Sequence, residues 1–375
     1  MKSTLLLPLA LALVLATTAL AQQAAPKPTP PRPGGIPADA AWHDVTTWGV
    51  EGRGWADQER KKWFDRLPAK AEGKVTAAVW GLSRDSAGMM VRFKTDAKAI
   101  YTRYTLTKTN LAMPHMPATG VSGLDLYARD TDGKWKWVQV TRPGSAKVET
   151  TLISDLAPGL REYAAYLPLY NGIESLAIGV PAGAQFEGLA PRAEKPIIFY
   201  GTSITHGACA SRPGMVHTAI LGRRFDRPVI NVGFSGNGRM DAAVGDLLAE
   251  IDAAAYVIDC LPNMGPADVT AKCVPLVKQL RAARPNTPIV LVEDRRFTND
   301  WITPGKKKFH DDNHAALRAA YDQLQKEGIT KLSYIPGDHL YGDDTEGATD
   351  ASHANDLGFM RQADVFEPVL RAAMK

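Results

Sequence analysis

The sequence predicts a β-rich domain followed by an α/β domain with a parallel sheet, the two meeting near residue 190. Three observations carry this prediction. Short segments that alternate apolar and polar residues, separated by turn signals, fill residues 42–190. Continuous apolar runs alternate with helical stretches in residues 191–375. The first 40 residues follow neither pattern and are predicted to lie outside the fold.

The β-rich half is predicted to be a sandwich or jelly roll, because many short strands at regular spacing favour these architectures. Turn signals lie at TDGK (131–134) and YNG (170–172). No helical period is apparent in this half. The predicted strands are AVWG (78–81), MVRFK (90–94), AIYTRYTL (99–106), LDLYA (124–128), WKWVQV (135–140) and SLAIGV (175–180).

The second half contains continuous apolar runs, which are typical of strands buried on both faces of a parallel sheet. Helical stretches at 241–251, 269–284 and 313–328 lie between them, as expected for helices on both faces of the sheet. The predicted strands are PIIFY (196–200), PVINV (228–232), AYVID (255–259), PIVLV (288–292) and LSYI (332–335).

The N-terminal segment has the features of a secretory signal peptide. Met1-Lys2 is followed by an apolar run over residues 5–20, and Ala19-Leu20-Ala21 offers small residues at a cleavage site after Ala21. An uncleaved membrane anchor is the alternative, although the run is short for a span. Residues 22–40 are rich in proline and predict an extended linker. We therefore expect a secreted or periplasmic protein.

Composition limits the classes of partner. The 375 residues carry a formal net charge of +4, which requires neither nucleic acid nor an anionic membrane, and no later run is long enough for stable membrane insertion. Three cysteines, Cys209, Cys260 and Cys273, are an odd number for a secreted protein. They allow one disulfide, or none if they are small buried residues, and are too scattered for a zinc site.

Chemically useful residues follow the predicted strands. Ser203 follows the first strand of the α/β half, Gly236 the second and Asn263 the third, while Asp350 and His353 lie near the C-terminus. Ligands bind at the carboxyl ends of strands in open α/β sheets, so these residues are expected at one edge.

This set is what acyl transfer requires. A serine hydroxyl becomes an effective nucleophile when a histidine takes its proton, and a carboxylate fixes the histidine tautomer. Asp350 lies three positions before His353, which allows their side chains to meet in a turn. The Ser203 N–H, the Gly236 N–H and the Asn263 amide could bind the oxyanion of the intermediate.

These residues resemble the blocks of the SGNH (GDSL-type) hydrolases. The segments GTSIT (201–205), NVGFSG (231–236), PNM (262–264) and DASH (350–353) stand in the family's order. The resemblance implies a flavodoxin-like domain, Ser203 as nucleophile, His353 as base and Asp350 as its partner. It implies an oxyanion hole of Ser203, Gly236 and Asn263, with neither metal nor cofactor.

Two departures point to a subfamily. Thr202 replaces the usual aspartate, and the asparagine block lacks its usual leading glycine and following aspartate. A subfamily with a β-rich N-terminal domain carries a Gly-x-Asp-Leu-Tyr motif, which GLDLY (123–127) matches. Asp125 and Tyr127 in this motif are either structural or reach the active-site edge.

Several residues allow simpler interpretations. Ser203 alone could be a helix N-cap and Asn263 a turn residue. We expect His206 on a helix surface and interpret Asp338-His339 as loop structure. His310 and His314 have i, i+4 spacing and could face a metal. The three lysines at 306–308 instead favour an exposed helix start just before them.

The expected activity is hydrolysis of carboxylic esters through an acyl-serine, with O-acetyl groups on an oligo- or polysaccharide as the favoured substrate. Other small esters remain open. The alternatives are a broad-specificity lipase or thioesterase, and a non-catalytic glycan-binding protein on a hydrolase scaffold. Most tryptophans before residue 140 are expected in the core, with one or two exposed as a sugar-stacking platform. The expected set is Trp42, Trp48, Trp55, Trp63, Trp80, Trp135 and Trp137.

Overall fold

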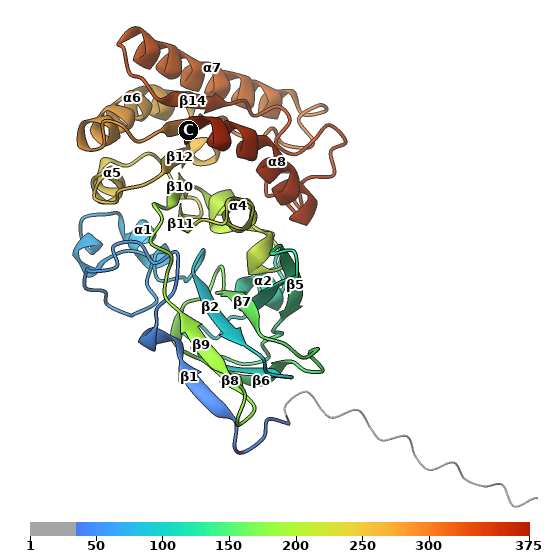
Figure 1. The fold of residues 1–375 in the computed structure, drawn as a ribbon. Helices are drawn as coiled ribbons and strands as arrows, with labels where there is room; N and C mark the ends of the chain where they lie inside the picture. The colour runs from blue at the N-terminus through green and yellow to red at the C-terminus, as the bar shows by residue number, and fades with distance from the viewer. Residues whose placement is uncertain (1–34) are drawn as a thin grey trace, which may run out of the picture.

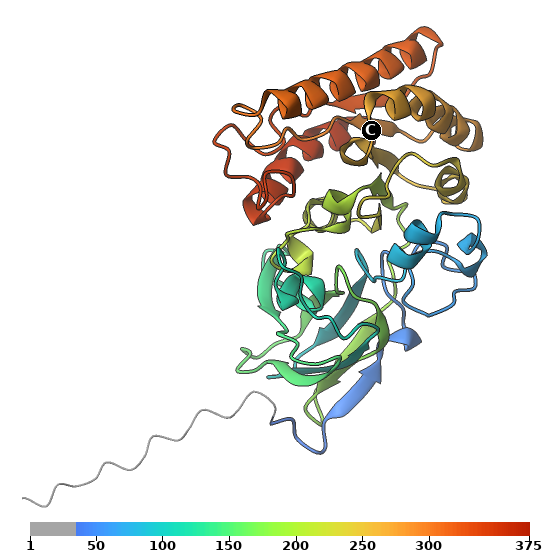
Figure 2. The same cartoon turned by 180° about the vertical axis from the view of Figure 1, so that it is seen from behind.

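The computed structural model describes residues 35–375. The predicted signal peptide and most of the predicted linker lie outside these residues. Figures 1 and 2 show two antiparallel sheets in the lower half of the molecule and a parallel sheet with helices in the upper half. No helix in the described part has the length and apolar character needed to cross a membrane.

The lower half is a two-sheet β structure, as predicted. The four-stranded sheet has the order β1-β8-β3-β6 and the five-stranded sheet the order β5-β4-β7-β2-β9, with antiparallel pairing throughout. The inward side chains of both sheets form one apolar core that includes Phe93, Tyr104 and Leu126. The first sheet comprises β1 (Ala41–Asp44), β8 (Ile173–Val180), β3 (Ile100–Leu106) and β6 (Lys147–Ile153). The second comprises β5 (Trp135–Val140), β4 (Asp125–Arg129), β7 (Arg161–Tyr166), β2 (Met90–Thr95) and β9 (Phe186–Leu189).

The strand predicted over 78–81 is wrong, because the structure has helix α1 (Ala77–Leu82) there. Thr76 caps this helix by accepting a hydrogen bond from the Val79 N–H at 3.2 Å. A four-residue apolar run cannot distinguish a strand from a buried helical turn, and the cap and the alanines favour the helix. A second short helix, α2 (Ala118–Val121), also contradicts the expectation of a half without helices.

The upper half has a five-stranded parallel sheet in the order β11-β10-β12-β13-β14. With β10 counted as the first strand, this order is 2-1-3-4-5, which is that of flavodoxin-like folds. The sheet is buried on both faces. The strands are β10 (Ile197–Gly201), β11 (Val229–Gly233), β12 (Ala255–Asp259), β13 (Ile289–Val292) and β14 (Leu332–Ile335).

Helices cover both faces of this sheet, and each face has its own apolar core. One core lies under α5 (Ala242–Ala249), α6 (Pro266–Ala283) and α7 (Pro304–Lys326), and the other under α4 (His217–Phe225) and α8 (Asp356–Ala373). Helix α7 begins nine residues before the predicted stretch, so the three lysines at 306–308 lie within its first turns. Helices α4 and α8 were not predicted.

Candidate active site

Ser203 lies at the topological switch point of the parallel sheet. It follows β10, whose neighbours β11 and β12 lie on opposite sides, and ligands of this fold bind at such a point. Thr202 is the N-cap of the short helix α3 (Ser203–His206), its side chain accepting from the Ile204 N–H at 3.3 Å. Ser203 is therefore the first helical residue rather than the cap, which leaves its hydroxyl available.

The structure brings the three residues of the predicted triad together. Ser203 Oγ lies 2.8 Å from His353 Nε2, and His353 Nδ1 lies 2.7 Å from Asp350 Oδ2. The Ser203 side chain is largely buried, while those of His353 and Asp350 are 26% and 41% exposed. A hydrogen-bonded chain thus runs from a hydroxyl through an imidazole to a carboxylate, at an edge that solvent can reach.

A tight turn holds Asp350 against His353. Asp350 Oδ1 accepts from the His353 N–H at 2.7 Å and the Ser352 N–H at 3.1 Å. Partial burial would raise the pKa of the Asp350 carboxyl, but these hydrogen bonds and the His353 ring outweigh it and hold that pKa below its ordinary value. Asp350 is therefore ionised at neutral pH. Ala351 occupies the left-handed region at φ 71°, and its carbonyl accepts from the Thr298 N–H at 2.9 Å.

The residues predicted for the oxyanion hole lie on loops that follow neighbouring strands. Asn263 ends a single 3-10 turn after β12, and Gly236 lies in the loop after β11 at φ 70°. With its amide oriented so that both loop donors are satisfied, Asn263 Oδ1 accepts from the N–H groups of Asn237 and Gly238 at 3.1 and 3.2 Å. Its Nδ2 is then turned away from these donors and can donate elsewhere.

A buried ion pair contacts α3, the helix that begins with Ser203. Arg295 and Asp259, both fully buried, form a two-pronged pair at the ends of β13 and β12. Thr205 in α3 donates to Asp259 Oδ2 at 3.1 Å. Burial raises the pKa of Asp259, and the Arg295 charge opposes that rise. This pair was not predicted, because Asp259 ends β12 and Arg295 lies in the loop after β13, and only the fold brings them together.

The predicted surface position of His206 is wrong. The side chain is fully buried, with Nε2 2.7 Å from the Leu169 carbonyl and its ring stacked 4.1 Å from that of Tyr170. Burial, with the nearby Arg66 charge, places the pKa of His206 well below its ordinary value, so the ring is neutral. Tyr170 also donates to the Ser203 carbonyl at 3.3 Å. The β-rich half thus packs directly beneath α3.

The exposed helix start expected at the three lysines 306–308 is confirmed, because α7 begins at Pro304 and Lys307 and Lys308 are exposed. His310 and His314 are both buried, with Nδ1 atoms 3.3 Å from Asp294 and 3.4 Å from Glu293. His310 Nε2 accepts from the Phe297 N–H at 3.2 Å, so the ring supports the loop after β13. Asp338 and His339 diverge as predicted: Asp338 accepts from Arg296, and His339 pairs with Asp343.

One group in the described residues has ligand atoms close enough to hold a metal ion, and it overlaps the triad. Cys209, Asp350 and His353 offer atoms within 4.8 Å of one another. Burial, with the Asp350 charge, raises the pKa of Cys209 to about 11, so the thiol is neutral at physiological pH. All three cysteines are free and buried, which leaves no disulfide among them.

The Gly-x-Asp-Leu-Tyr motif contacts the loop that follows α3. Asp125 is fully buried and accepts from the Gly214 N–H at 2.8 Å, from Arg212 at 3.0 Å and from the Trp137 indole at 2.9 Å. Tyr127 accepts from the same arginine. Of the two interpretations left open, the structural one fits Asp125, because its carboxylate oxygens are occupied by protein donors.

One side chain near the triad was missed entirely. His115, in the loop between β3 and α2, has its ring centroid 6.1 Å from that of His353. No local pattern could have identified it, since the two residues lie 238 positions apart in the chain.

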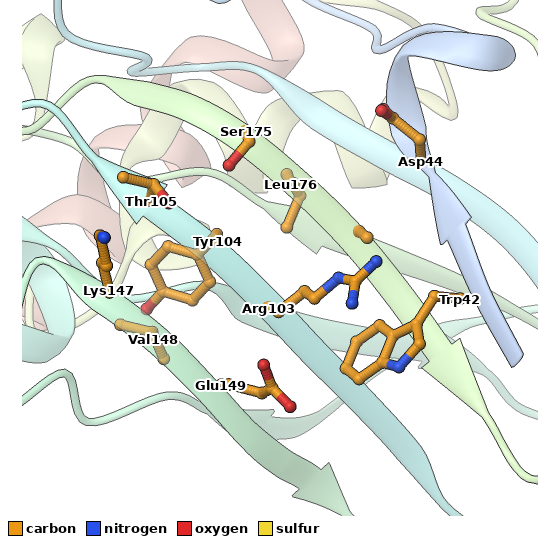
Figure 3. A pocket seen from close by; sticks show the side chains of 11 residues that line it. Trp42, Asp44, Arg103, Tyr104, Thr105, Lys147, Val148, Glu149, Ser175 and Leu176 are labelled. Atoms are coloured by element: carbon orange, nitrogen blue, oxygen red, sulfur yellow. The ribbon is translucent and has the colours of Figure 1, made fainter. Parts of the chain in front are cut away.

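Of the seven tryptophans before residue 140, Trp137 is 48% exposed, as expected for one or two of them. Trp55 is buried and the other five are half-buried, four of them packed against the apolar cores. A hollow of about 470 Å³ on the outer face of the four-stranded sheet contains Trp42 but none of the triad. Figure 3 shows the Arg103 side chain extending toward Trp42, over whose ring it lies at 4.5 Å. Trp301, outside the expected set, is 72% exposed.

Comparisons with known proteins agree with this architecture. Residues 194–371 match the GDSL-like lipase/acylhydrolase family, and residues 40–186 match the GxDLY domain, the N-terminus of SGNH-hydrolase-type esterases. Among curated proteins, none matches.

Solved structures with the same architecture include the following three. A protein of Bacteroides ovatus ATCC 8483 described as a GDSL-like lipase is 31% identical, with a TM-score of 0.84 over 89% of this chain and 98% of its own. A salicylyl-acyltransferase from a tetracycline biosynthetic pathway is 20% identical, with a TM-score of 0.70 over 90% and 98%. An acetyl xylan esterase of Butyrivibrio proteoclasticus is 10% identical, with a TM-score of 0.54 over 89% and 98%, and so shares the fold alone.

Proposed function

The chain belongs to the GDSL-like lipase/acylhydrolase family, with a GxDLY domain at its N-terminus, and from this premise we propose a serine esterase that acts outside the cytoplasm. The observation that carries the proposal is the hydrogen-bonded chain from Ser203 through His353 to Asp350.

In the proposed reaction, Ser203 Oγ attacks the ester carbonyl while His353 Nε2 takes its proton. Asp350 holds the imidazole so that Nδ1 carries a proton and Nε2 is free to accept one. The Ser203 N–H, the Gly236 N–H and the Asn263 Nδ2 stabilise the oxyanion. His353 then returns the proton to the alcohol oxygen as the C–O bond breaks. Water, activated by the same histidine, releases the acid from the acyl-serine.

We propose O-acetyl groups on a carbohydrate as the substrate. A secretory signal peptide would bring the enzyme to polysaccharides outside the cytoplasm, and an acetyl xylan esterase shares the fold. No metal or cofactor takes part in the proposed reaction. A glycan-binding protein without turnover is disfavoured, because a scaffold that had lost catalysis would not require the triad distances to be kept.

The test is hydrolysis of 4-nitrophenyl esters, from acetate to a long acyl chain, by the mature protein and by Ser203→Ala and His353→Ala. Each substitution is expected to lower kcat by at least ~10³ with folding intact. The matched control is His339→Ala, which removes an exposed histidine that also bonds an aspartate. Substantial turnover by Ser203→Ala would refute the assignment. Turnover confined to acetate would favour an acetylesterase, whereas activity on long chains would favour the lipase alternative.

A further inference from the structure

The loop over residues 107–117 brings the β-rich half to the catalytic edge. It leaves β3 in the four-stranded sheet and ends at α2, which lies beside the upper half in Figure 1. Met116 is 2% exposed and packs in the same apolar core as Ile204 and Phe199, and Met113 packs against that core from its edge. The loop is therefore seated in the catalytic half, although its chain belongs to the other.

The tip of this loop is a rigid turn. Met113 and Met116 exchange two backbone hydrogen bonds, both of 3.0 Å, which close a four-residue turn around Pro114 and His115. Proline at the second position fixes φ for such a turn, and Pro117 restricts the residue that precedes it. His115 is exposed at the tip, so its position is set by the turn, by the buried Met116 and by Met113, which packs against the core.

His115 faces His353 without bonding to it. The ring centroids are 6.1 Å apart with planes inclined by 34°. Both nitrogens of His353 are already engaged, Nε2 with Ser203 and Nδ1 with Asp350. The His115 imidazole therefore keeps a donor and an acceptor for a substrate group beside the His353 ring.

The geometry of ester cleavage determines which part of a substrate lies beside the rings of His353 and His115. The alcohol oxygen must lie near His353 Nε2, since that atom returns the proton as the alcohol leaves. The carbonyl oxygen of the ester is instead expected at the proposed oxyanion donors, Gly236 and Asn263. Because His115 lies beside His353, groups on the carbons next to the ester oxygen are the part of the substrate that we expect near His115.

We propose that His115 is a substrate-binding residue, which recognises a hydroxyl next to the ester oxygen and so selects esters of polyhydroxylated alcohols such as sugars. This inference rests on the proposed function. A neutral imidazole donates through one nitrogen and accepts through the other, and a sugar hydroxyl can do both, so the two are complementary. The β-rich domain thereby takes part in substrate selection in addition to supporting the catalytic domain.

The test compares two acetates of similar size: a singly acetylated methyl xyloside with a free hydroxyl beside the ester, and cyclohexyl acetate, which has none. Wild type, His115→Ala, His115→Gln and the control His339→Ala are measured on both. Loss of one hydrogen bond to a hydroxyl is expected to lower the kcat/KM ratio of xyloside to cyclohexyl acetate about 5- to 10-fold in His115→Ala. The change should appear mainly in KM. His115→Gln, which keeps a donor and an acceptor, should restore part of the ratio, and His339→Ala should not change it.

The outcomes separate the two proposals. If wild type hydrolyses neither acetate, the proposed function fails. If wild type hydrolyses both but His115→Ala leaves the ratio unchanged, or lowers both activities equally, the recognition of the hydroxyl is refuted while the esterase stands. Because His115 is exposed, urea unfolding of His115→Ala should match wild type, which keeps a folding defect from imitating the result.

Discussion

Replacing Asp350 with asparagine separates the charge of the triad from its shape. The Asp350 carboxylate has two duties: Oδ1 accepts from the N–H groups of Ser352 and His353, and Oδ2 faces His353 Nδ1 at 2.7 Å. Asparagine keeps an oxygen for the turn, so the loop should persist. Its NH₂ group, however, then donates toward Nδ1 and places the imidazole proton on Nε2. That nitrogen could no longer accept the proton of Ser203.

The magnitude follows from the exposure of the pair. Two unit charges 4 Å apart attract by about 1 kcal/mol in water and about 4 kcal/mol near a protein surface. Asp350 is 41% exposed. A loss of about 3 kcal/mol in stabilisation of the imidazolium corresponds to roughly 10² in rate. With the wrong tautomer added, Asp350→Asn should lower kcat by roughly 10³.

The assay is steady-state hydrolysis of 4-nitrophenyl acetate at neutral pH, with urea unfolding as a check on the fold. Asp343→Asn is the matched control, because Asp343 Oδ1 lies 2.8 Å from His339 Nδ1 in a second, exposed aspartate–histidine pair. This control should keep the wild-type kcat. If Asp350→Asn retains more than about a tenth of the wild-type kcat, the reasoning about charge and tautomer is refuted.

Three further predictions concern the surroundings of the triad. Asn263→Ala should lower kcat by about 10²–10³ while KM changes little, because an oxyanion-hole donor acts mainly in the transition state; a loss confined to KM would contradict this role. Gly238→Ala should destabilise the fold by about 1–3 kcal/mol in urea unfolding, because its Cβ would clash with the backbone carbonyl at the end of β10. Gly236→Ala, where a Cβ meets nothing within 4 Å but φ is 70°, should lose only about 1 kcal/mol; equal losses would contradict this comparison. Cys209 should resist iodoacetamide at pH 7 and react as the pH rises toward its pKa of about 11; inactivation of the enzyme at pH 7 that Cys209→Ser abolishes would show that the thiolate is more accessible than its burial indicates.

The parallel sheet and its edge could be predicted from the sequence because both depend on local patterns. Buried parallel strands are continuous apolar runs, so Ile197–Gly201 and Ala255–Asp259 were located to within a residue or two. Once the strands are known, the edge rule places Ser203 and Asn263 close together without any knowledge of side-chain contacts. The positions of Asp350 and His353 followed from their spacing and from the family resemblance.

The remaining features depend on contacts that local patterns do not encode. His206 and His310 are polar residues, for which exposure is the ordinary expectation, yet both are buried with specific hydrogen-bond partners. The Asp259–Arg295 pair joins the ends of two strands, and His115 reaches His353 across the domain boundary. In each case the partner is distant in the chain, so only the tertiary structure could identify it.

The contacts of Asp125 connect the Gly-x-Asp-Leu-Tyr motif to the proposed active site through the loop that follows α3. A buried carboxylate is costly unless donors surround it, and here Gly214, Arg212 and Trp137 supply them. Residues 207–216 therefore form a segment fixed to the β-rich domain at one end and to the serine helix at the other. The same segment donates from the Ser211 N–H to an Asp356 carboxylate oxygen at 2.9 Å, at the start of the helix that follows His353. One loop thus connects the motif to the segments that carry Ser203 and His353, so the geometry of the proposed active site depends on both halves of the chain.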